Sequence, residues 1–458
     1  MRLLSKMNWG FVEILFLIVI FVVGLLSTYF LLPYVIKLMK KKNYIGYDIH
    51  KNSRPEVAES GGLSFVLGFI ITSIFLMVFF INFLSEILIF VLTVLLAAII
   101  GFIDDRIKLK SRYKIILSIF SGTIIFIANS VGFVKISSPT IPILDRTRLS
   151  IIYPFMIPLL VAIFGNTVNM LEGYNGEGSG TCLIAVISLL ICAIIWDSAQ
   201  GVLFSIPVIA VLIPFFLKNK FPAQVFPGDI GTLSMGAMIA CIMLFGSLEV
   251  AAFCALLIHI FNSFYVIYSV RGFLESDKIR EGKDDIILLE NDLIKASDQK
   301  DAALTLPRLI LARGPLSEPE LVNKFFIISI ICGIFAILSV LFTQLTRGIL
   351  NIGLFIIIFI LFLIPIAFFL IKYPRIRGTI VLMVILLIAA IIFFLLVELI
   401  IMPLPIADIR LGIISIPVNL IFTLIIGLIG LIGWYFITIK YFWFQINSMK
   451  KEEMNKQG

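Results

Sequence analysis

The chain has 458 residues, of which 60% are hydrophobic and only 14% are charged, and its mean hydropathy is +1.13. A soluble domain carries about 25% charged residues, so this composition excludes a soluble protein and predicts an integral membrane protein that crosses the bilayer many times. The membrane part should be all-α, because lipid offers no hydrogen-bond partners to an open backbone. The net charge of +8 is expected to come from cytoplasmic loops and does not indicate nucleic-acid binding.

Apolar segments of about 20 residues are long enough to span a bilayer. The sequence contains thirteen of them, at residues 10–36, 61–83, 86–103, 114–132, 150–170, 180–197, 199–217, 232–247, 249–271, 323–343, 347–371, 378–402 and 411–440. The eighth is the shortest. The first is too long for a signal-peptide core and lacks a small-residue cleavage site, so it should be retained. The five cysteines lie inside apolar segments and predict small buried side chains, not disulfides.

Basic residues follow the first, third, seventh, ninth, eleventh and thirteenth predicted spans, which places them on one side of the membrane. The exceptions are Arg2, Lys6, Lys135, Arg146, Arg148 and Arg410. Since Lys and Arg accumulate in cytoplasmic loops, we expect the N-terminus outside and the C-terminus in the cytoplasm. The polar clusters of the chain fall in the same loops, so the functional site is expected at the cytoplasmic face.

The fifth predicted span carries a polar face. Asn166, Asn169 and Glu172 recur at intervals of three and therefore share one side of a helix, and glycines follow from residue 173. A helix end capped by Gly and Asn would explain the glycines, but it would not explain three polar residues on one face. Polar groups inside a membrane mark functional sites, so this run predicts a ligand site.

Two adjacent carboxylates, Asp104 and Asp105, end the third predicted span and are followed by basic residues up to Lys114. The pair could hold a hard cation such as Mg²⁺, or one carboxylate could act as a base, because a like charge raises its pKa. The lysines could hold phosphate. The alternative for the basic residues is a solvated cytoplasmic loop.

Three weaker clusters complete the set. Asp229 stands between glycines before the eighth predicted span, where a helix start favours anions, or where Asp serves as a helix cap. Arg308 and Arg313 lie in the long charged loop after the ninth span and could fork onto phosphate oxygens. Glu59 precedes a glycine pair that could allow a ligand close to the backbone, or form a plain turn.

In this order the clusters resemble the polyprenyl-phosphate N-acetylhexosamine-1-phosphate transferases of glycosyltransferase family 4. These membrane enzymes move a sugar 1-phosphate from a UDP-sugar to a lipid phosphate. The resemblance is most similar to the archaeal and eukaryotic branch that acts on UDP-GlcNAc and dolichyl phosphate, since the last loop lacks the histidines of the bacterial branch. It rests on Asp104, Asp105 and Lys114; on Asn166, Asn169, Glu172, Gly173, Asn175 and Gly176; on Gly228, Asp229, Gly231, Thr232 and Leu233; and on the loop around Arg308 and Arg313.

The resemblance implies a ten-helix transferase core in residues 1–345. The remaining residues, 346–458, would form about three extra membrane helices and a basic cytoplasmic tail. These extra helices carry no site motif and are expected to be a structural or partner-binding addition, so a chain ending near residue 345 should keep some activity.

The resemblance also implies roles for individual residues. The catalytic set is Asp104 and Asp105, near the lipid phosphate, with Lys114 on phosphate oxygens. Mg²⁺, or else Mn²⁺, would be held by Asn169 and Asp229. Substrate-binding residues would be Asn166, Glu172, Gly173, Asn175, Phe226, Arg308, Arg313 and Glu59. Within that set Gly173, Asn175 and Phe226 would frame the uridine, and Arg308 or Arg313 would hold phosphate.

The implied partners are a UDP-sugar, a polyprenyl or dolichyl phosphate and membrane lipid, with a homodimer allowed and nucleic acid excluded. Glu177 departs from the branch pattern, which has an apolar residue before the acid, so its position is left open. Glu172 either assists the metal or shapes the sugar pocket. A transporter would need charges at mid-depth and paired broken helices, which the sequence lacks, and the intact acids and amides argue against an inactive scaffold.

Overall fold

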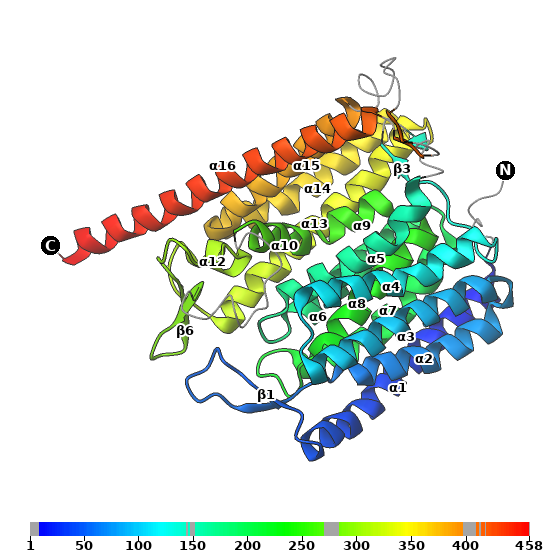
Figure 1. Cartoon of the computed structure of the whole chain (residues 1–458), viewed down its shortest axis with the longest axis horizontal. Helices are drawn as coiled ribbons and strands as arrows, with labels where there is room; N and C mark the ends of the chain where they lie inside the picture. Colours follow the sequence, from blue (N-terminus) through cyan, green and yellow to red (C-terminus); the bar gives the residue numbers. More distant parts are fainter. Residues whose placement is uncertain are drawn as a thin grey trace.

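The computed structural model describes residues 9–142, 145–146, 152–269, 284–396, 409–411, 414–416 and 418–457. The helices of this part form one long bundle (Figure 1). The first eight are α1 (Phe11–Lys41), α2 (Gly62–Phe79), α3 (Leu84–Ile107), α4 (Ser111–Ser130), α5 (Ile152–Leu171), α6 (Glu177–Ile195), α7 (Ala199–Asn219) and α8 (Gly228–Gly246). They are followed by α9 (Glu249–Ala255), α10 (Leu257–Ser269), α12 (Leu306–Leu311), α13 (Glu318–Thr346), α14 (Ile352–Lys372), α15 (Arg377–Leu396) and α16 (Val418–Gln457).

The prediction of an all-α polytopic membrane protein is confirmed. Ten helices in the described residues are long and apolar enough to cross a membrane, and the bent pair α9–α10 would make eleven. Each predicted span overlaps at least one described helix, and the last two fall in α15 and α16. α16 has 40 residues and is therefore about 60 Å long, so its C-terminal part extends past the neighbouring helices (Figure 1).

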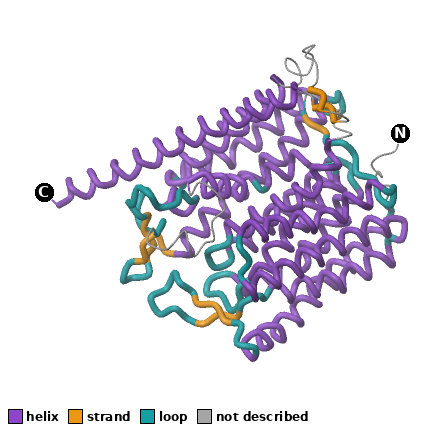
Figure 2. The backbone as a smooth tube through the Cα atoms, viewed as in Figure 1, coloured by secondary structure: helices purple, strands orange, loops and turns teal. Residues whose placement is uncertain are grey.

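Short strands lie only at the two ends of the described bundle (Figure 2). At one end are the antiparallel hairpin of β1 (Ile45–Tyr47) and β2 (Glu56–Ala58) and the three-stranded sheet of β5 (Ile286–Leu288), β6 (Leu293–Ala296) and β7 (Leu316–Ser317). At the other end are the pairs β3 (Thr140–Ile141) with β4 (Asp145–Arg146), and β8 (Ile409–Leu411) with β9 (Ile414–Ile416). α1 begins at this second end and α16 finishes at the first (Figure 1).

The ninth predicted span, 249–271, is wrong as a single helix. The chain bends by 68° between α9 and α10, although residues 249–269 contain neither proline nor glycine. In the new direction Asn262 joins α10 to two distant segments. Its Nδ2 donates to the Met170 carbonyl at 3.0 Å, and its Oδ1 accepts from the Leu306 N–H at 2.9 Å.

The eighth predicted span, the shortest, becomes the most enclosed of the ten candidate spans in the described residues, because 89% of its most apolar stretch is buried. α8 can lie this close to its neighbours because glycines stand at the contacts, as is typical of membrane helix packing. A Cβ on Gly62 of α2 would lie 2.3 Å from Gly231 Cα, and one on Gly101 of α3 would lie 2.3 Å from the Asp229 carbonyl oxygen. α8 therefore holds Asp229 at a fixed height in the bundle.

Buried apolar side chains form two clusters. The first runs through α1–α9 and part of α13. The second joins α10, α12 and the N-terminal half of α13 to buried residues of the C-terminal helices, among them Ile380, Met383, Trp434 and Phe442. The predicted boundary near residue 345 thus separates α13 from α14 in sequence, while the second cluster extends across it.

Candidate active site

A cavity of about 780 Å³ opens at the end of the bundle that carries β1, β2 and β5–β7. It is lined by the β1–β2 hairpin, the end of α3, the start of α4, the end of α5, the start of α8, α10 and the segment before α12. Of the predicted site residues, Glu59, Asp104, Asp105, Lys114, Asn166, Asn169, Glu172, Gly173, Asn175, Phe226 and Asp229 line it. Segments far apart in sequence thus meet in one hollow.

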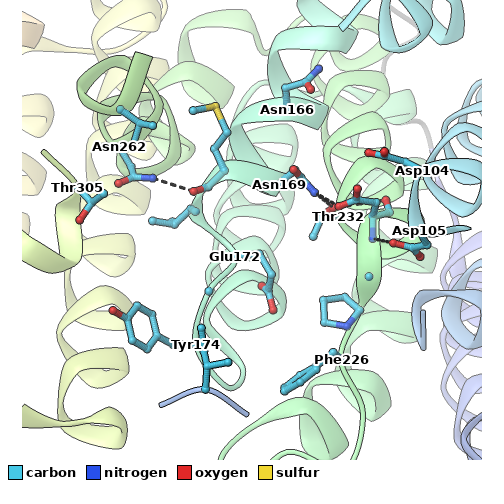
Figure 3. Close-up of a pocket in the computed structure, with 18 of the residues that line it drawn as sticks. Asp104, Asp105, Asn166, Asn169, Glu172, Tyr174, Phe226, Thr232, Asn262 and Thr305 are labelled. Carbon is cyan, nitrogen blue, oxygen red and sulfur yellow. Dashed lines mark hydrogen bonds between the residues drawn. The ribbon is translucent and has the colours of Figure 1, made fainter. Parts of the chain in front are cut away.

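Lys114 is the centre of a charged cluster. Its Nζ lies 2.6 Å from Asp229 Oδ2, 2.7 Å from Asp104 Oδ2 and 3.1 Å from Asn169 Oδ1. Asn169 Nδ2 donates in turn to Asp229 Oδ1 and, at 2.8 Å, to Thr232 Oγ1 (Figure 3). Four helices contribute to the cluster, with Asp104 from α3, Lys114 from α4, Asn169 from α5, and Asp229 and Thr232 from α8. The packing of these helices therefore fixes the cluster.

The other carboxylate of the aspartate pair holds the start of α8. Asp105 Oδ1 accepts from the Asp229 N–H at 2.6 Å, and its Oδ2 accepts from Ser60 Oγ at 2.7 Å. The preceding Gly228 has φ +65°, which favours glycine, and a Cβ there would lie 2.6 Å from Asp105 Oδ2. Asp105 is therefore bound to backbone, while Asp104 faces Lys114.

The turn after α5 is built around two glutamates. Glu177 Oε2 accepts from the N–H groups of Gly173 and Tyr174 at 3.1 and 3.2 Å, so this acid holds the glycine turn from the start of α6. Glu172 projects into the cavity between Tyr174 and Phe226 (Figure 3). One oxygen of each glutamate, Glu172 Oε2 and Glu177 Oε1, is buried without a hydrogen-bond partner.

Burial acts on the pKa values of the acids outside the membrane helices. It raises the pKa of Glu172 to about 8. Burial also raises the pKa of Glu59, with the nearby Asp229 charge adding to the effect. Burial acts against the charge of Asp48 too, but hydrogen bonds from Lys51 and Asn175 hold the pKa of Asp48 below its usual value. Near neutral pH Glu172 therefore carries a proton and can donate a hydrogen bond.

Asn175 is held by two acids from distant segments. Its backbone N–H donates to Glu318 Oε1 at 2.7 Å, and its Nδ2 donates to Asp48 Oδ2 at 2.9 Å. Beside them the His50 ring stacks on Tyr174 with centroids 4.2 Å apart. Asp48, His50 and Tyr174 line the cavity but were absent from the predicted set. Their neighbours in sequence, Glu59, Gly173 and Asn175, were in the predicted set.

Two loops meet at the rim of the cavity. Asn52, in the β1–β2 connection, donates from its backbone N–H and its Nδ2 to Asp292 Oδ1 at 2.8 and 2.7 Å, and from Nδ2 to the Leu289 carbonyl at 2.9 Å. Asp292 belongs to the β5–β6 turn and has φ +57°. We call this contact the rim latch. It joins two hairpins that each line the cavity.

Arg308 and Arg313 are the two predicted site residues that do not line the cavity. Arg308 is 2% exposed, and its guanidinium donates to the carbonyls of Ser297, Gln299, Ala302 and Ala303. Arg313 donates to Gln445 Oε1 at 2.8 Å and to the Pro374 carbonyl at 2.6 Å. In this structure both arginines bind protein acceptors.

The cavity is strongly acidic. Two lysines in its described lining, Lys108 and Lys114, face seven acidic side chains, which are Asp48, Glu59, Asp104, Asp105, Glu172, Asp229 and Asp285. An anionic ligand would be repelled by this lining unless further positive charge accompanied it. Carboxylate and amide oxygens are the donors that hard divalent cations prefer, so the lining suits a ligand that arrives with such a cation.

Comparison with known proteins shows to which family this chain belongs. Residues 87–247, from α3 to the end of α8, match the model for glycosyl transferase family 4. A protein of Methanocaldococcus jannaschii, provisionally named a glycosyltransferase, is 33% identical over 303 residues, which are 66% of this chain and 90% of that protein. The chain belongs to glycosyl transferase family 4.

Two further relatives of this glycosyl transferase family 4 chain carry more specific names. A Sulfolobus acidocaldarius protein, provisionally named UDP-N-acetylglucosamine–dolichyl-phosphate N-acetylglucosaminephosphotransferase, is 30% identical over 343 residues, 73% of this chain and 97% of that protein. The phospho-N-acetylmuramoyl-pentapeptide-transferase of Streptococcus uberis is 28% identical over 274 residues, 56% and 81% of the two chains. The family-model match contains the aspartate pair, Lys114, the polar face of α5 and Asp229.

Proposed function

We propose that the chain transfers N-acetylhexosamine 1-phosphate from a UDP-sugar to a polyprenyl phosphate and releases UMP. Family membership supports a phosphate-linked sugar transfer, and the names of the archaeal relatives favour GlcNAc 1-phosphate as the group and dolichyl phosphate as the acceptor. The observation that carries the proposal is the Lys114–Asn169–Asp229 cluster beside Asp104, in a cavity at one end of a membrane bundle.

The reaction exchanges one phosphate linkage for another. An acceptor phosphate oxygen forms a bond to the sugar-bearing phosphorus of the UDP-sugar, and the bond from this phosphorus to the bridging oxygen breaks, so the oxygen leaves with UMP. Such transfers require mainly positioning and charge neutralisation. A cavity at the end of the bundle lets a water-soluble nucleotide reach a phosphate whose polyprenyl chain stays in lipid.

The residues of the cavity divide this work between them. Lys114 supplies a positive charge for phosphate oxygens, and Asp104 holds its ammonium in place. Asp105 fixes the start of α8 and thereby the height of Asp229. The turn from Gly173 to Asn175, with Phe226 across the cavity, would receive the nucleotide, and the protonated Glu172 between them would donate a hydrogen bond to it (Figure 3).

The donor set also fits a divalent cation. We propose that Asp229 and Asn169 hold Mg²⁺ and that Mn²⁺ can replace it, because their oxygens meet beside Lys114 and the lining carries an excess of carboxylates. A bound Mg²⁺ would neutralise pyrophosphate charge. We further propose that the cavity faces the cytoplasm, since the basic loops lie at this end and α16 ends there.

The test uses membranes that contain the full chain, radiolabelled UDP-GlcNAc, and either dolichyl or undecaprenyl phosphate. We expect a lipid-linked product and released UMP, both abolished by EDTA and restored by Mg²⁺. Asp229→Asn should remove the product at equal protein level. Asp197→Asn is the matched control, because Asp197 follows α6 at the opposite end and its φ of +57° suits Asn as well. A wild-type chain without product from any UDP-HexNAc donor would refute the proposal.

A further inference from the structure

The C-terminal helices share a hydrophobic cluster with one wall of the cavity. This wall, here called the α12 wall, consists of α10, residues 302–305 and α12, and it contributes Asn262, Ala303, Thr305 and Pro307 to the lining. Leu304, Leu306 and Leu309 of the same wall are buried in one cluster with side chains of α16. One side of the wall therefore lines the cavity, and the other side packs against α16.

One face of α16 makes these contacts. Trp434, Thr438, Phe442 and Gln445 follow each other at intervals of four, four and three, which aligns them along the helix. The Trp434 ring stacks on Tyr265 of α10 with centroids 4.9 Å apart, and it meets Phe261 edge-on at 5.0 Å. Thr438 Oγ1 is hydrogen-bonded to the Tyr265 hydroxyl. Trp434 and Thr438, the N-terminal half of this face, therefore pack against α10.

Phe442 supports the Arg308 guanidinium. Arg308 Cζ lies 4.7 Å from the centre of the Phe442 ring, a distance at which a cation and an aromatic face attract each other. Phe442 is 1% exposed. The four carbonyl groups that Arg308 binds, from Ser297 to Ala303, belong to the segment that leads into the cavity lining. Arg308 therefore links Phe442 of α16 to the backbone that leads into the cavity lining.

Gln445 holds the C-terminal end of α12 through a hydrogen bond with Arg313. Its Oε1 accepts from Arg313 Nε at 2.8 Å. Arg313 also donates to the Pro374 carbonyl, and Arg375 donates to the Gly314 carbonyl at 2.8 Å. Both ends of α12 are therefore fastened to residues beyond position 345.

We propose that α16 positions the α12 wall for binding of the donor nucleotide sugar, with Phe442 and Gln445 acting as positioning residues through Arg308 and Arg313. The inference rests on the proposed function for the identity of the ligand. Thr305 and Asn262 lie on the side of the cavity opposite Asp104 and Asp105 (Figure 3). Asn262 of this wall also donates to the Met170 carbonyl at the end of α5, just before the turn from Gly173 to Asn175 that is proposed to receive the nucleotide.

The test compares two phenylalanines on one helix. Phe442→Leu removes the ring under Arg308, and Phe444→Leu is the matched control, because Phe444 is 68% exposed. In the full chain in nanodiscs, Phe442→Leu should raise KM for UDP-GlcNAc about three- to tenfold, the range expected when a cation–π contact is lost. The values of kcat and of KM for dolichyl phosphate should stay within about twofold. Phe444→Leu should match the wild type.

Hydrogen–deuterium exchange of residues 297–307 gives a readout that needs no substrate. It should be faster in Phe442→Leu and in Gln445→Ala than in Phe444→Leu, whereas Gln445→Glu keeps an acceptor for Arg313 and should restore wild-type exchange. Equal exchange and equal KM in Phe442→Leu and Phe444→Leu would overturn the inference. If the wild type makes no product, the proposed function fails, and the exchange comparison still decides whether α16 orders the wall.

Discussion

The Lys114 ammonium lies 2.6 Å from the Asp229 carboxylate, across 115 residues of sequence. The same nitrogen is 2.7 Å from Asp104. One cation therefore serves one carboxylate at the end of α3 and one at the start of α8, and the cluster would carry uncompensated negative charge without it.

Replacing this cation should remove activity. We expect Lys114→Met to lower kcat/KM by about 10²-fold or more, the usual effect of losing one group that stabilises developing charge. Initial rates of UMP release measure it. Lys110→Met serves as the control, because Lys110 is exposed and lies outside the lining. A Lys114→Met enzyme with activity within twofold of the wild type would contradict the assignment.

Glu172 should make stability depend on pH. Its pKa in the fold is about 8 against about 4.3 for a free glutamate, so between these values the folded chain binds a proton that the unfolded chain has lost. The stability contribution of this group is complete below about pH 4 and is lost as the pH rises toward 8. The difference in Tm between Glu172→Gln and the wild type should therefore grow from pH 5 to pH 8.

The control for this measurement is Glu290→Gln, since Glu290 is exposed. Both variants are compared with the wild type over the same pH range. A Glu172→Gln difference that is constant with pH would show that Glu172 does not hold the extra proton. Activity of Glu172→Gln at several Mg²⁺ concentrations then separates its two open roles, because only a residue that assists the metal changes the metal requirement.

Gly101 should tolerate no side chain. A Cβ would lie 2.3 Å from the Asp229 carbonyl oxygen, so Gly101→Ala must push α3 away from α8 and shift Asp229. We expect a loss of about 1–3 kcal/mol in stability, as for other overpacked sites, together with loss of transferase activity. Gly433→Ala is the control, because its Cβ would meet nothing within 4 Å. Thermal unfolding in detergent and UMP release give the two readouts.

The rim latch should govern loop mobility more than stability. Asn52→Ala removes the side-chain bonds to Asp292 and Leu289, which are exposed, so we expect a stability change below about 1 kcal/mol. Limited proteolysis should nonetheless cut faster within residues 48–55 and 288–293. Asn129→Ala, at the opposite end of the bundle, should leave these sites protected. Unchanged cleavage in Asn52→Ala would show that the loops are held by other contacts.

Local patterns were sufficient for much of this architecture. Apolar runs located the helices, and the three-residue spacing of Asn166, Asn169 and Glu172 placed all three in the cavity lining. These features depend on helix periodicity, which neighbouring residues encode. Asp104 and Asp105 could also be predicted, because they end a membrane helix, where polar groups have few structural uses.

Long-range contacts account for what the sequence did not reveal. Arg308 binds backbone carbonyl groups. Every residue carries such a carbonyl, so the sequence cannot show which of them an arginine binds. Beyond the break at Leu256, α10 is held by Asn262, which meets Met170 and Leu306. Glu318 reaches Asn175 across 143 residues, and α16 reaches α12 over a similar gap. Each of these contacts requires the folded bundle before it can be identified.

The enclosure of α8 also bears on the order in which the protein can assemble during synthesis. A helix whose most apolar stretch is 89% buried contacts little lipid in the folded bundle. The helices that α8 packs against most closely, α3 and α5, leave the ribosome before it does. Lys114 and Asn169 are therefore already synthesised when Asp229 emerges, and the acid can meet both as α8 enters the bundle.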